Sequence, residues 1–171
     1  MPTVLPEYLK TLNPIRIGII SDTHGWLPPG VAAAFRGVHA ILHAGDMEDP
    51  EALNQLRRIA PAVGVRGNMD HGKWAAALPP AALVTLGRKT FYILHNLHQL
   101  DLLPEAADID VVVSGHTHEP AVVRNNGVLY LNPGSAAFPR RGSPAGGLLV
   151  RIDGDRITAV PVAFNDNGDP S

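Results

Sequence analysis

The chain has 171 residues, of which 45% are apolar and 18% are charged, and its net charge at pH 7 is −2. This length and composition are typical of one globular domain with its own core. The balanced charge and the lack of a basic run give no sign of nucleic-acid binding through bulk electrostatics. Because the chain has no cysteine, disulfides, thiolate metal ligands and a thiol nucleophile are excluded.

The two ends of the chain carry little organised pattern. Residues 1–14 contain three prolines and have neither the charged region nor the apolar region of a signal peptide. We expect them to form a loose leader, and residues 164–171 to form a loose, polar tail. Since no apolar run is long enough to span a membrane, we expect a single cytoplasmic domain over residues 1–171 with no membrane contact.

The first buried strand ends in two residues that can bind a metal ion. The apolar run 15–20 is followed by Asp22 and His24, and then by a glycine. Side chains two positions apart in an extended segment lie on the same face, so this carboxylate and this imidazole can converge on one point. A convergent acid and imidazole are typical of a metal site.

Four further strand-like runs end in the same way. Open α/β sheets place their sites at the carboxyl ends of the strands, so these five ends predict one shared site. The residues that follow the four runs are Asp46 after 40–44, Asn68 and Asp70 after 62–65, His95 after 90–94, and His116 with His118 after 111–113. His43 lies within the second run, where we expect it to be hydrogen-bonded beside the site.

The remaining pattern predicts an α/β fold. Helices are expected at 31–36, at 50–58, where Asp49 caps a start with Pro50 and Glu51, and near 100–107. Hairpins are expected for 82–86 with 90–94, for 121–124 with 128–131, and for 147–152 with 156–162. We therefore expect a four-layer sandwich of two mixed β-sheets flanked by helices.

Taken in order, the motifs resemble a known family. They read Asp22-x-His24, Gly45-Asp46, Gly67-Asn68-x-Asp70, His95 and Gly115-His116-x-His118. This order resembles the calcineurin-like metallophosphoesterases, and most closely their small bacterial and archaeal phosphodiesterase branch. The resemblance runs from about residue 15 to residue 140, and 132–135 with Pro139 and Arg140 is similar to the closing loop of that branch.

The resemblance implies a site with two divalent metal ions bridged by Asp46. It assigns Asp22, His24 and His118 to one ion, and Asn68, His95 and His116 to the other. Oxygen and nitrogen ligands suit a mid-row ion, so manganese is expected first and iron, nickel, cobalt or zinc also fit. Candidate catalytic residues are Asn68, Asp70 and His98, and Arg140 is a candidate for binding the substrate phosphate.

Two departures from the family pattern concern the general acid. Many relatives carry a histidine after the Gly-Asn pair, where it can protonate the leaving oxygen, but this chain has Met69. The segment His95-Asn96-Leu97-His98 also stands where relatives usually show His-Gly-His. Whether His71 or His98 replaces the missing acid is left open.

The leading functional prediction is a phosphodiesterase that cleaves a small phosphoester substrate. A phosphomonoesterase is the second enzyme alternative. The third is a non-catalytic scaffold similar to the retromer subunit of this fold, which has lost metal ligands, and the complete ligand set argues against it. The sequence leaves the natural substrate, the physiological metal and any homo-oligomer open.

Overall fold

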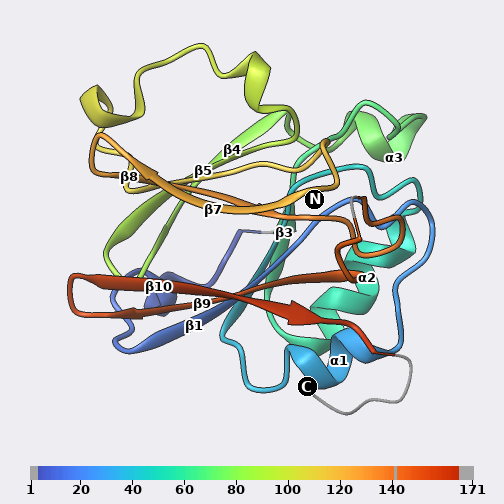
Figure 1. Cartoon of the computed structure of the whole chain (residues 1–171), viewed down its shortest axis with the longest axis horizontal. Helices are drawn as coiled ribbons and strands as arrows, with labels where there is room; N and C mark the ends of the chain where they lie inside the picture. Colours follow the sequence, from blue (N-terminus) through green and yellow to red (C-terminus); the bar gives the residue numbers. More distant parts are fainter. Residues whose placement is uncertain (1–3, 141, 166–171) are drawn as a thin grey trace.

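The computed structural model describes residues 4–140 and 142–165, which form two five-stranded sheets (Figure 1). The first sheet has the strand order β10-β9-β1-β2-β3 and the second has the order β4-β5-β6-β8-β7. The strands of the first sheet are β1 (Ile15–Ile20), β2 (Ala40–His43), β3 (Ala62–Gly64), β9 (Gly146–Asp153) and β10 (Arg156–Ala163). Those of the second are β4 (Ala81–Leu86), β5 (Lys89–Leu94), β6 (Val111–Val113), β7 (Pro120–Asn125) and β8 (Val128–Pro133).

Both sheets are mixed, as predicted. Strands β1, β2 and β3 are parallel, whereas β9 is antiparallel to both β1 and β10. In the second sheet β5, β6 and β8 are parallel, and β4 and β7 are antiparallel edge strands. The carboxyl ends of β1, β2 and β3 therefore lie along one edge of their sheet, and those of β5 and β6 along one edge of the other.

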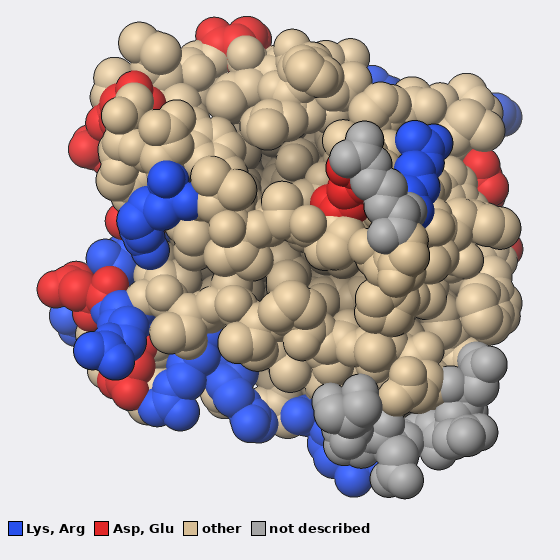
Figure 2. Space-filling view, in the orientation of Figure 1, with Lys and Arg blue, Asp and Glu red and all other residues tan. Residues whose placement is uncertain are grey.

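Charged side chains on the face shown in Figure 2 lie in separate groups. Most of the Lys and Arg side chains lie toward the left and lower margins, whereas one acidic group lies nearer the middle of the face. None of the helices within residues 4–140 and 142–165 is long and apolar enough to cross a membrane.

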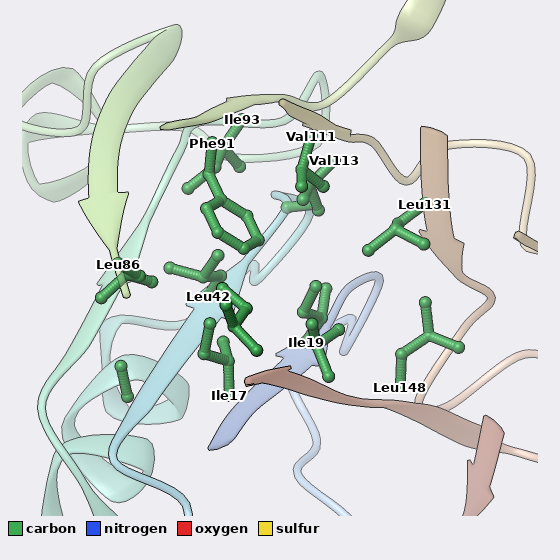
Figure 3. Packing of buried hydrophobic residues seen from close by; sticks show 14 of the residues in the cluster. Ile17, Ile19, Leu42, Leu86, Phe91, Ile93, Val111, Val113, Leu131 and Leu148 are labelled. Atoms are coloured by element: carbon green, nitrogen blue, oxygen red, sulfur yellow. The ribbon is translucent and has the colours of Figure 1, made fainter. Parts of the chain in front are cut away.

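The main core fills the space between the two sheets (Figure 3). Alternate residues of a strand point to the same face, so Ile17 and Ile19 of β1 meet Phe91 and Ile93 of β5 across this space. All four side chains are fully buried. The two sheets thus hold each other face to face, and the strand ends that carry polar residues are fixed relative to one another.

Helices cover the outer face of the first sheet. The helices are α1 (Gly30–Ala34), α2 (Pro50–Ile59) and α3 (Lys73–Ala76). The predicted cap of α2 is confirmed, since the Glu51 N–H donates to Asp49 Oδ1 at 2.8 Å. Buried apolar residues of this layer, Phe35 and Leu56 among them, pack on Ile20 and Ile41 of the sheet. Gly18 is required here, because a Cβ atom would lie 2.9 Å from the Phe35 ring.

The outer face of the second sheet carries a thinner layer. The 3₁₀ helices η2 (Leu97–Gln99) and η3 (Pro104–Ala106) lie in the segment between β5 and β6. Leu100 and Leu102 pack against the small cluster that contains Ile109 and Val112. The predicted helix near 100–107 is therefore wrong, because this segment buries its leucines through short turns. The prediction of two mixed sheets with flanking helices is confirmed.

The prediction of a loose leader is wrong for residues 7–12. The 3₁₀ helix η1 (Glu7–Lys10) places Leu9 in the main core, where its side chain is fully buried. The Gly87 N–H donates to Leu9 O at 2.9 Å, which ties this segment to the β4–β5 turn. At the other end Phe164 is also buried, with its ring centroid 5.5 Å from that of Phe35. Residues 1–3 and 166–171 of the two expected loose ends lie outside the described residues.

Candidate metal centre

The loops after five strands bring the predicted ligands to one place, at the carboxyl ends of β1, β2, β3, β5 and β6. The loops after β1 and β2 are joined by backbone hydrogen bonds. The Asp22 N–H donates to Gly45 O and the His24 N–H donates to Asp46 O, each at 3.0 Å. These bonds extend the pairing of β1 and β2 beyond the strands and hold the two acidic residues side by side.

Asp22, His24 and His118 form the first group of possible metal ligands, in which one ligand atom from each residue lies within 4.8 Å of the others. His118 Nε2 is 3.2 Å from Asp22 Oδ1 and 3.2 Å from His24 Nε2. His24 Nε2 is 3.8 Å from Asp22 Oδ1. These are the three residues that the family resemblance assigns to one ion.

Asp22, Asp46 and His95 form the second group, and all three are buried. Asp46 Oδ2 lies 3.2 Å from His95 Nε2 and 4.0 Å from His24 Nε2. The Asp46 carboxylate therefore lies between imidazoles of the two groups. Asp22 belongs to both groups, a sharing that the family assignment did not include.

The histidines are oriented by their second ring nitrogen. Nδ1 of His95 lies 2.7 Å from Ala44 O, and Nδ1 of His118 lies 2.7 Å from Phe138 O. A carbonyl oxygen can only accept, so each Nδ1 carries the hydrogen and each neutral ring presents the Nε2 lone pair to the acids. His24 Nδ1 lies 3.3 Å from the Glu48 carboxylate, which favours the same tautomer. Such outer partners are typical of metal-binding histidines.

Two buried atoms in this cluster have no hydrogen-bond partner among the described residues: Asp22 Oδ1 and His95 Nε2. The other carboxylate oxygen of Asp22 is satisfied, because it accepts from Ser21 Oγ at 2.7 Å and from the His116 N–H at 3.1 Å. A buried polar atom without a partner is unfavourable. Because lone pairs of carboxylate and imidazole face each other here, a divalent cation fits this donor set.

The backbone around the cluster adopts a conformation that non-glycine residues rarely take. Left-handed backbone of this kind is unfavourable for an ordinary side chain and is concentrated at functional sites. Long-range contacts of the loops must therefore maintain it. The residues of the site with positive φ are Asp22, His24, Asp46, Glu48, His116 and His118.

Comparisons with known proteins agree with this geometry. The family model of the calcineurin-like phosphoesterase superfamily domain matches residues 15–155. The chain belongs to this superfamily. A protein of Methanothermobacter thermautotrophicus named "probable metallophosphoesterase" is 36% identical, over 84% of this chain and 89% of that protein.

Two further proteins are similar to this chain in sequence or in structure. Phosphodiesterase YfcE of Escherichia coli is 29% identical over 89% of this chain and 94% of its own. A solved structure of YfcE matches with a TM-score of 0.63 and 25% identity, covering 88% of this chain and all of that one. The structure of vacuolar protein sorting 29 from Cryptosporidium parvum gives a TM-score of 0.75 at 22% identity, covering 94% and 96% of the two chains, which shows the fold alone.

These findings confirm the predicted family and fold, and at the level of the superfamily they confirm the prediction of a phosphoester hydrolase.

Two glycines of the family motifs, Gly67 and Gly115, are required for steric reasons. A Cβ atom on Gly67 would collide with Asp46, and one on Gly115 would collide with Ser21 and Asp22. The loops can approach the two acids this closely only because these positions have no side chain.

Asn68 and His116 lie on the more open side of the centre. Asn68 is exposed, and its Oδ1 lies 3.1 Å from His116 Nδ1. The His116 ring is 5.2 Å from the His95 ring, measured between centroids, in an edge-to-face arrangement. The structure therefore brings both residues beside the second group, with Asn68 and His116 in contact with each other.

Asp70 lies behind Asp46 and outside the two ligand groups. Its buried carboxylate accepts from the N–H groups of Asp46 at 3.1 Å, Glu48 at 2.7 Å and Gly67 at 2.7 Å. It thereby holds the loop that carries Asp46. These contacts give Asp70 a role in supporting the loop, and its assignment as a candidate catalytic residue stays a prediction from the sequence.

The other two candidates lie further out. His98 is exposed in η2, and its backbone N–H donates to Asn96 Oδ1 at 3.0 Å. No contact of its ring with the cluster is found among the described residues, so the structure does not bring this candidate acid to the centre. Arg140 is exposed, and its N–H donates to His118 O at 3.4 Å, which places its backbone next to a ligand residue.

His43 is hydrogen-bonded beside the site, as expected. It is fully buried, accepts from the Gly45 N–H at 3.1 Å through Nδ1, and lies 3.1 Å from Thr23 Oγ1 through Nε2. Burial lowers its pKa to about 3. The neutral imidazole of His43 thus contacts both the loop that carries Asp22 and the loop that carries Asp46.

The protonation of the acids and of His95 is also shifted. Burial raises the pKa of Asp22. Burial alone would raise the pKa of Asp46, but the neighbouring His95 and the Met69 N–H outweigh it, so the pKa of Asp46 lies below its ordinary value. Burial alone would lower the pKa of His95, and the Asp46 carboxylate reverses this, so the pKa is raised. The opposite shifts of Asp46 and His95 share one cause, the short contact between this carboxylate and this imidazole.

Sequence reasoning missed three residues of the site: Glu48 beside His24, Ser135 and Phe138. Ser135 Oγ donates to Asp22 O at 2.8 Å, and Phe138 O accepts from His118 as described above. Ser135 lies in the closing-loop motif, so a signal existed for that loop. Nothing in the local sequence indicates which ligand the loop would contact.

Proposed function

We propose that this chain is a two-metal phosphodiesterase that hydrolyses small phosphodiesters. The observation that carries the proposal is the position of the Asp46 carboxylate between the imidazoles of two ligand groups. Beside it lie buried Asp22 Oδ1 and His95 Nε2, which have no hydrogen-bond partner within residues 4–140 and 142–165. The names of the curated relatives, phosphodiesterase among them, support the same reaction class.

In this proposal Asp22, His24 and His118 hold one ion, and His95, Asn68 and His116 hold the other, with Asp46 between them. Two bound divalent ions would supply a nucleophile at neutral pH and positive charge for the phosphoryl oxygens. The donor set of carboxylate, imidazole and amide suits manganese, which we expect first, and also iron, cobalt, nickel and zinc.

The chain's own residues would orient the substrate from the open side. Asn68 is neutral, so it adds no negative charge where an anionic phosphodiester must approach. The Arg140 side chain, on the loop tied to His118, can donate two parallel hydrogen bonds to a phosphoryl oxygen pair. The net charge of −2 gives no sign of nucleic-acid binding and favours a small substrate.

The test is to load purified protein with manganese, count the bound ions, and compare hydrolysis of bis(p-nitrophenyl) phosphate with that of p-nitrophenyl phosphate. We expect two ions per chain and a higher kcat/KM for the diester. Asp46→Asn should remove most activity and lower the metal content, because the bridging position loses its charge.

Asp153→Asn is the matched control, because this acid lies in the β9–β10 hairpin at the opposite end of the sheet and its side chain is 54% exposed. It should leave metal content and activity unchanged. One bound ion or none in the wild type would overturn the two-metal assignment. A preference for the monoester would favour the phosphomonoesterase alternative instead.

A further inference from the structure

An aromatic side chain stands exposed beside the metal ligands. Phe138 follows β8 in the loop that closes over the centre, and 60% of its surface is exposed. Its ring is 5.6 Å from the His24 ring, measured between centroids, and meets it edge-on at 66°. One side of the phenyl ring is therefore packed on a ligand residue, and most of the ring is exposed to solvent.

The backbone that carries this ring is firmly held. Ser135 Oγ accepts from the N–H groups of Phe138 at 2.8 Å and Ala137 at 3.2 Å, and it donates to Asp22 O at 2.8 Å. Phe138 O accepts from His118 Nδ1 at 2.7 Å. Hydrogen bonds to two ligand residues thus fix the position of Phe138, so its exposure is not the result of a free loop.

Three more exposed apolar side chains lie in the ligand-bearing loops. Trp26 is two positions after His24, Met69 directly follows Asn68, and Leu97 is two positions after His95. With Phe138 we call these side chains the apolar rim, defined by their exposure and by their positions close in sequence to candidate ligands: Trp26, Met69, Leu97 and Phe138. Exposed apolar side chains close to polar ligand residues suit the binding of a partly apolar ligand.

The apolar rim and the polar metal centre suit different parts of one ligand. The cation site and Arg140 suit an anionic phosphoryl group. A flat apolar group attached to that phosphoryl group can pack on the Phe138 ring, because aromatic rings gain both from burial and from their preferred stacked or edge-on geometry. A simple alkyl ester would leave the ring exposed.

We propose that Phe138 is a specificity-determining residue that packs against an aromatic ester group of the substrate, either aryl or nucleobase. This inference rests on the proposed phosphodiesterase function and names the class of substrate. The shared chemistry is a phosphoryl anion that carries a flat aromatic group.

The test measures ground-state binding by manganese-loaded protein, using phosphonates that cannot be hydrolysed. Calorimetry should compare phenylphosphonate, an acyclic adenine nucleoside phosphonate and methylphosphonate, which share the anionic group and differ in the attached group. We expect wild type to bind at least one aromatic phosphonate about tenfold more tightly than methylphosphonate, which corresponds to ~1.4 kcal/mol. The two aromatic probes distinguish an aryl source from a nucleotide source.

Phe138→Ala should reduce this preference to near unity while two ions remain bound, because the backbone carbonyl that orients His118 is kept. Phe138→Tyr should retain the preference, since the ring remains. For bis(p-nitrophenyl) phosphate, Phe138→Ala should lower kcat/KM about tenfold, mainly through KM. Tyr8→Ala is the control, because Tyr8 is 59% exposed and lies in η1, beside the β4–β5 turn at the opposite end of the second sheet.

An unchanged preference in Phe138→Ala would overturn the inference and leave the rim as a surface for a protein partner. Equal weakening of all three phosphonates, with loss of metal, would also overturn it, because Phe138 would then act only through His24 and His118. Failure of the proposed function is a separate result. Wild type could bind the aromatic phosphonates with the expected preference and still hydrolyse no diester.

Discussion

His95 Nε2 lies 3.2 Å from Asp46 Oδ2, and this contact joins the loop after β5 in the second sheet to the loop after β2 in the first. The other polar atom of each side chain is held by the backbone: His95 Nδ1 donates to Ala44 O, and Asp46 Oδ1 accepts from the Met69 N–H at 2.8 Å. The two sheets thus share a polar contact at the point where the proposed ions bind.

Removing metal should therefore loosen the contact between the two sheets. A ligand that binds only the folded state stabilises it by mass action, by about 2.7 kcal/mol at a free concentration of 100 times its Kd. We expect chelation of the manganese-loaded protein to lower its Tm, and His95→Gln to show a smaller loss on chelation because it binds metal more weakly. A Tm that does not respond to chelation in the wild type would contradict this.

Asp70→Asn should weaken metal binding without removing a ligand. The Asp70 carboxylate accepts three backbone N–H groups, and the amide nitrogen of asparagine would face at least one of them. We expect metal affinity to fall roughly 10–100-fold, and the unpaired N–H to cost about 1–3 kcal/mol in stability. Metal titration and urea unfolding measure the two effects. An unchanged metal affinity in Asp70→Asn would show that the loop holds Asp46 in place without the Asp70 carboxylate.

Arg140→Ala should raise KM for diesters by roughly tenfold, consistent with the loss of one charge-assisted contact to phosphate, and leave metal content unchanged. The reason is that the Arg140 backbone is tied to His118 while its side chain is exposed. Arg156→Ala, an exposed arginine in the β9–β10 hairpin, serves as the control. Unchanged KM and kcat in Arg140→Ala would mean that the arginine is only a surface charge.

Because residue 69 is a methionine, we expect the rate of diester hydrolysis to depend on the leaving group. The Met69 side chain is exposed next to Asn68 and cannot donate a proton, and a positioned general acid typically contributes about 10²–10⁴-fold in rate. In a series of aryl diesters, we expect a steep dependence on leaving-group pKa in the wild type and a shallower one in Met69→His. His71→Ala should change little, because His71 is exposed beyond Asp70. A flat wild-type series, with chemistry rate-limiting, would reveal another acid.

Because the His43 imidazole is buried, we expect the free energy of unfolding to fall in acid. Its pKa in the folded protein is about 3, against an ordinary value of 6.5. The unfolded chain therefore binds a proton that the folded one does not, and the free energy of unfolding falls as the pH drops from 6.5 toward 3. The slope from this residue is about 1.4 kcal/mol per pH unit. Urea unfolding of metal-free protein between pH 6 and pH 4 should show a smaller slope for His43→Gln, and equal slopes would argue against a buried neutral His43.

The order of the elements and the types of metal ligand could be predicted from the sequence. The runs before Asp22, Asp46 and His95 are rich in apolar residues. Local backbone preference and burial both favour a strand for such runs. The rule that parallel strands end at one edge then brings their ligands together. For this reason the family resemblance and the sandwich fold were predicted correctly, although the contacts among the ligands were not.

Where the prediction failed, tertiary packing was the reason. The segment around Leu9 has no periodic pattern, yet it fills a gap in the main core beside the β4–β5 turn. The position of Leu9 depends on contacts with distant segments, so it could not be predicted from the neighbouring residues.

The sequence by itself determined which chemical groups are available at the strand ends, because residue type and strand pattern are local properties. Only the tertiary structure decided which ring nitrogen faces the centre, that Asp22 belongs to both ligand groups, and that Phe138 lies beside them. Those features depend on hydrogen bonds between distant segments, such as Ser135 to Asp22 across 113 residues, and on left-handed backbone at Asp22 and His118. Such a backbone is unfavourable in isolation and persists only where the surrounding fold holds it.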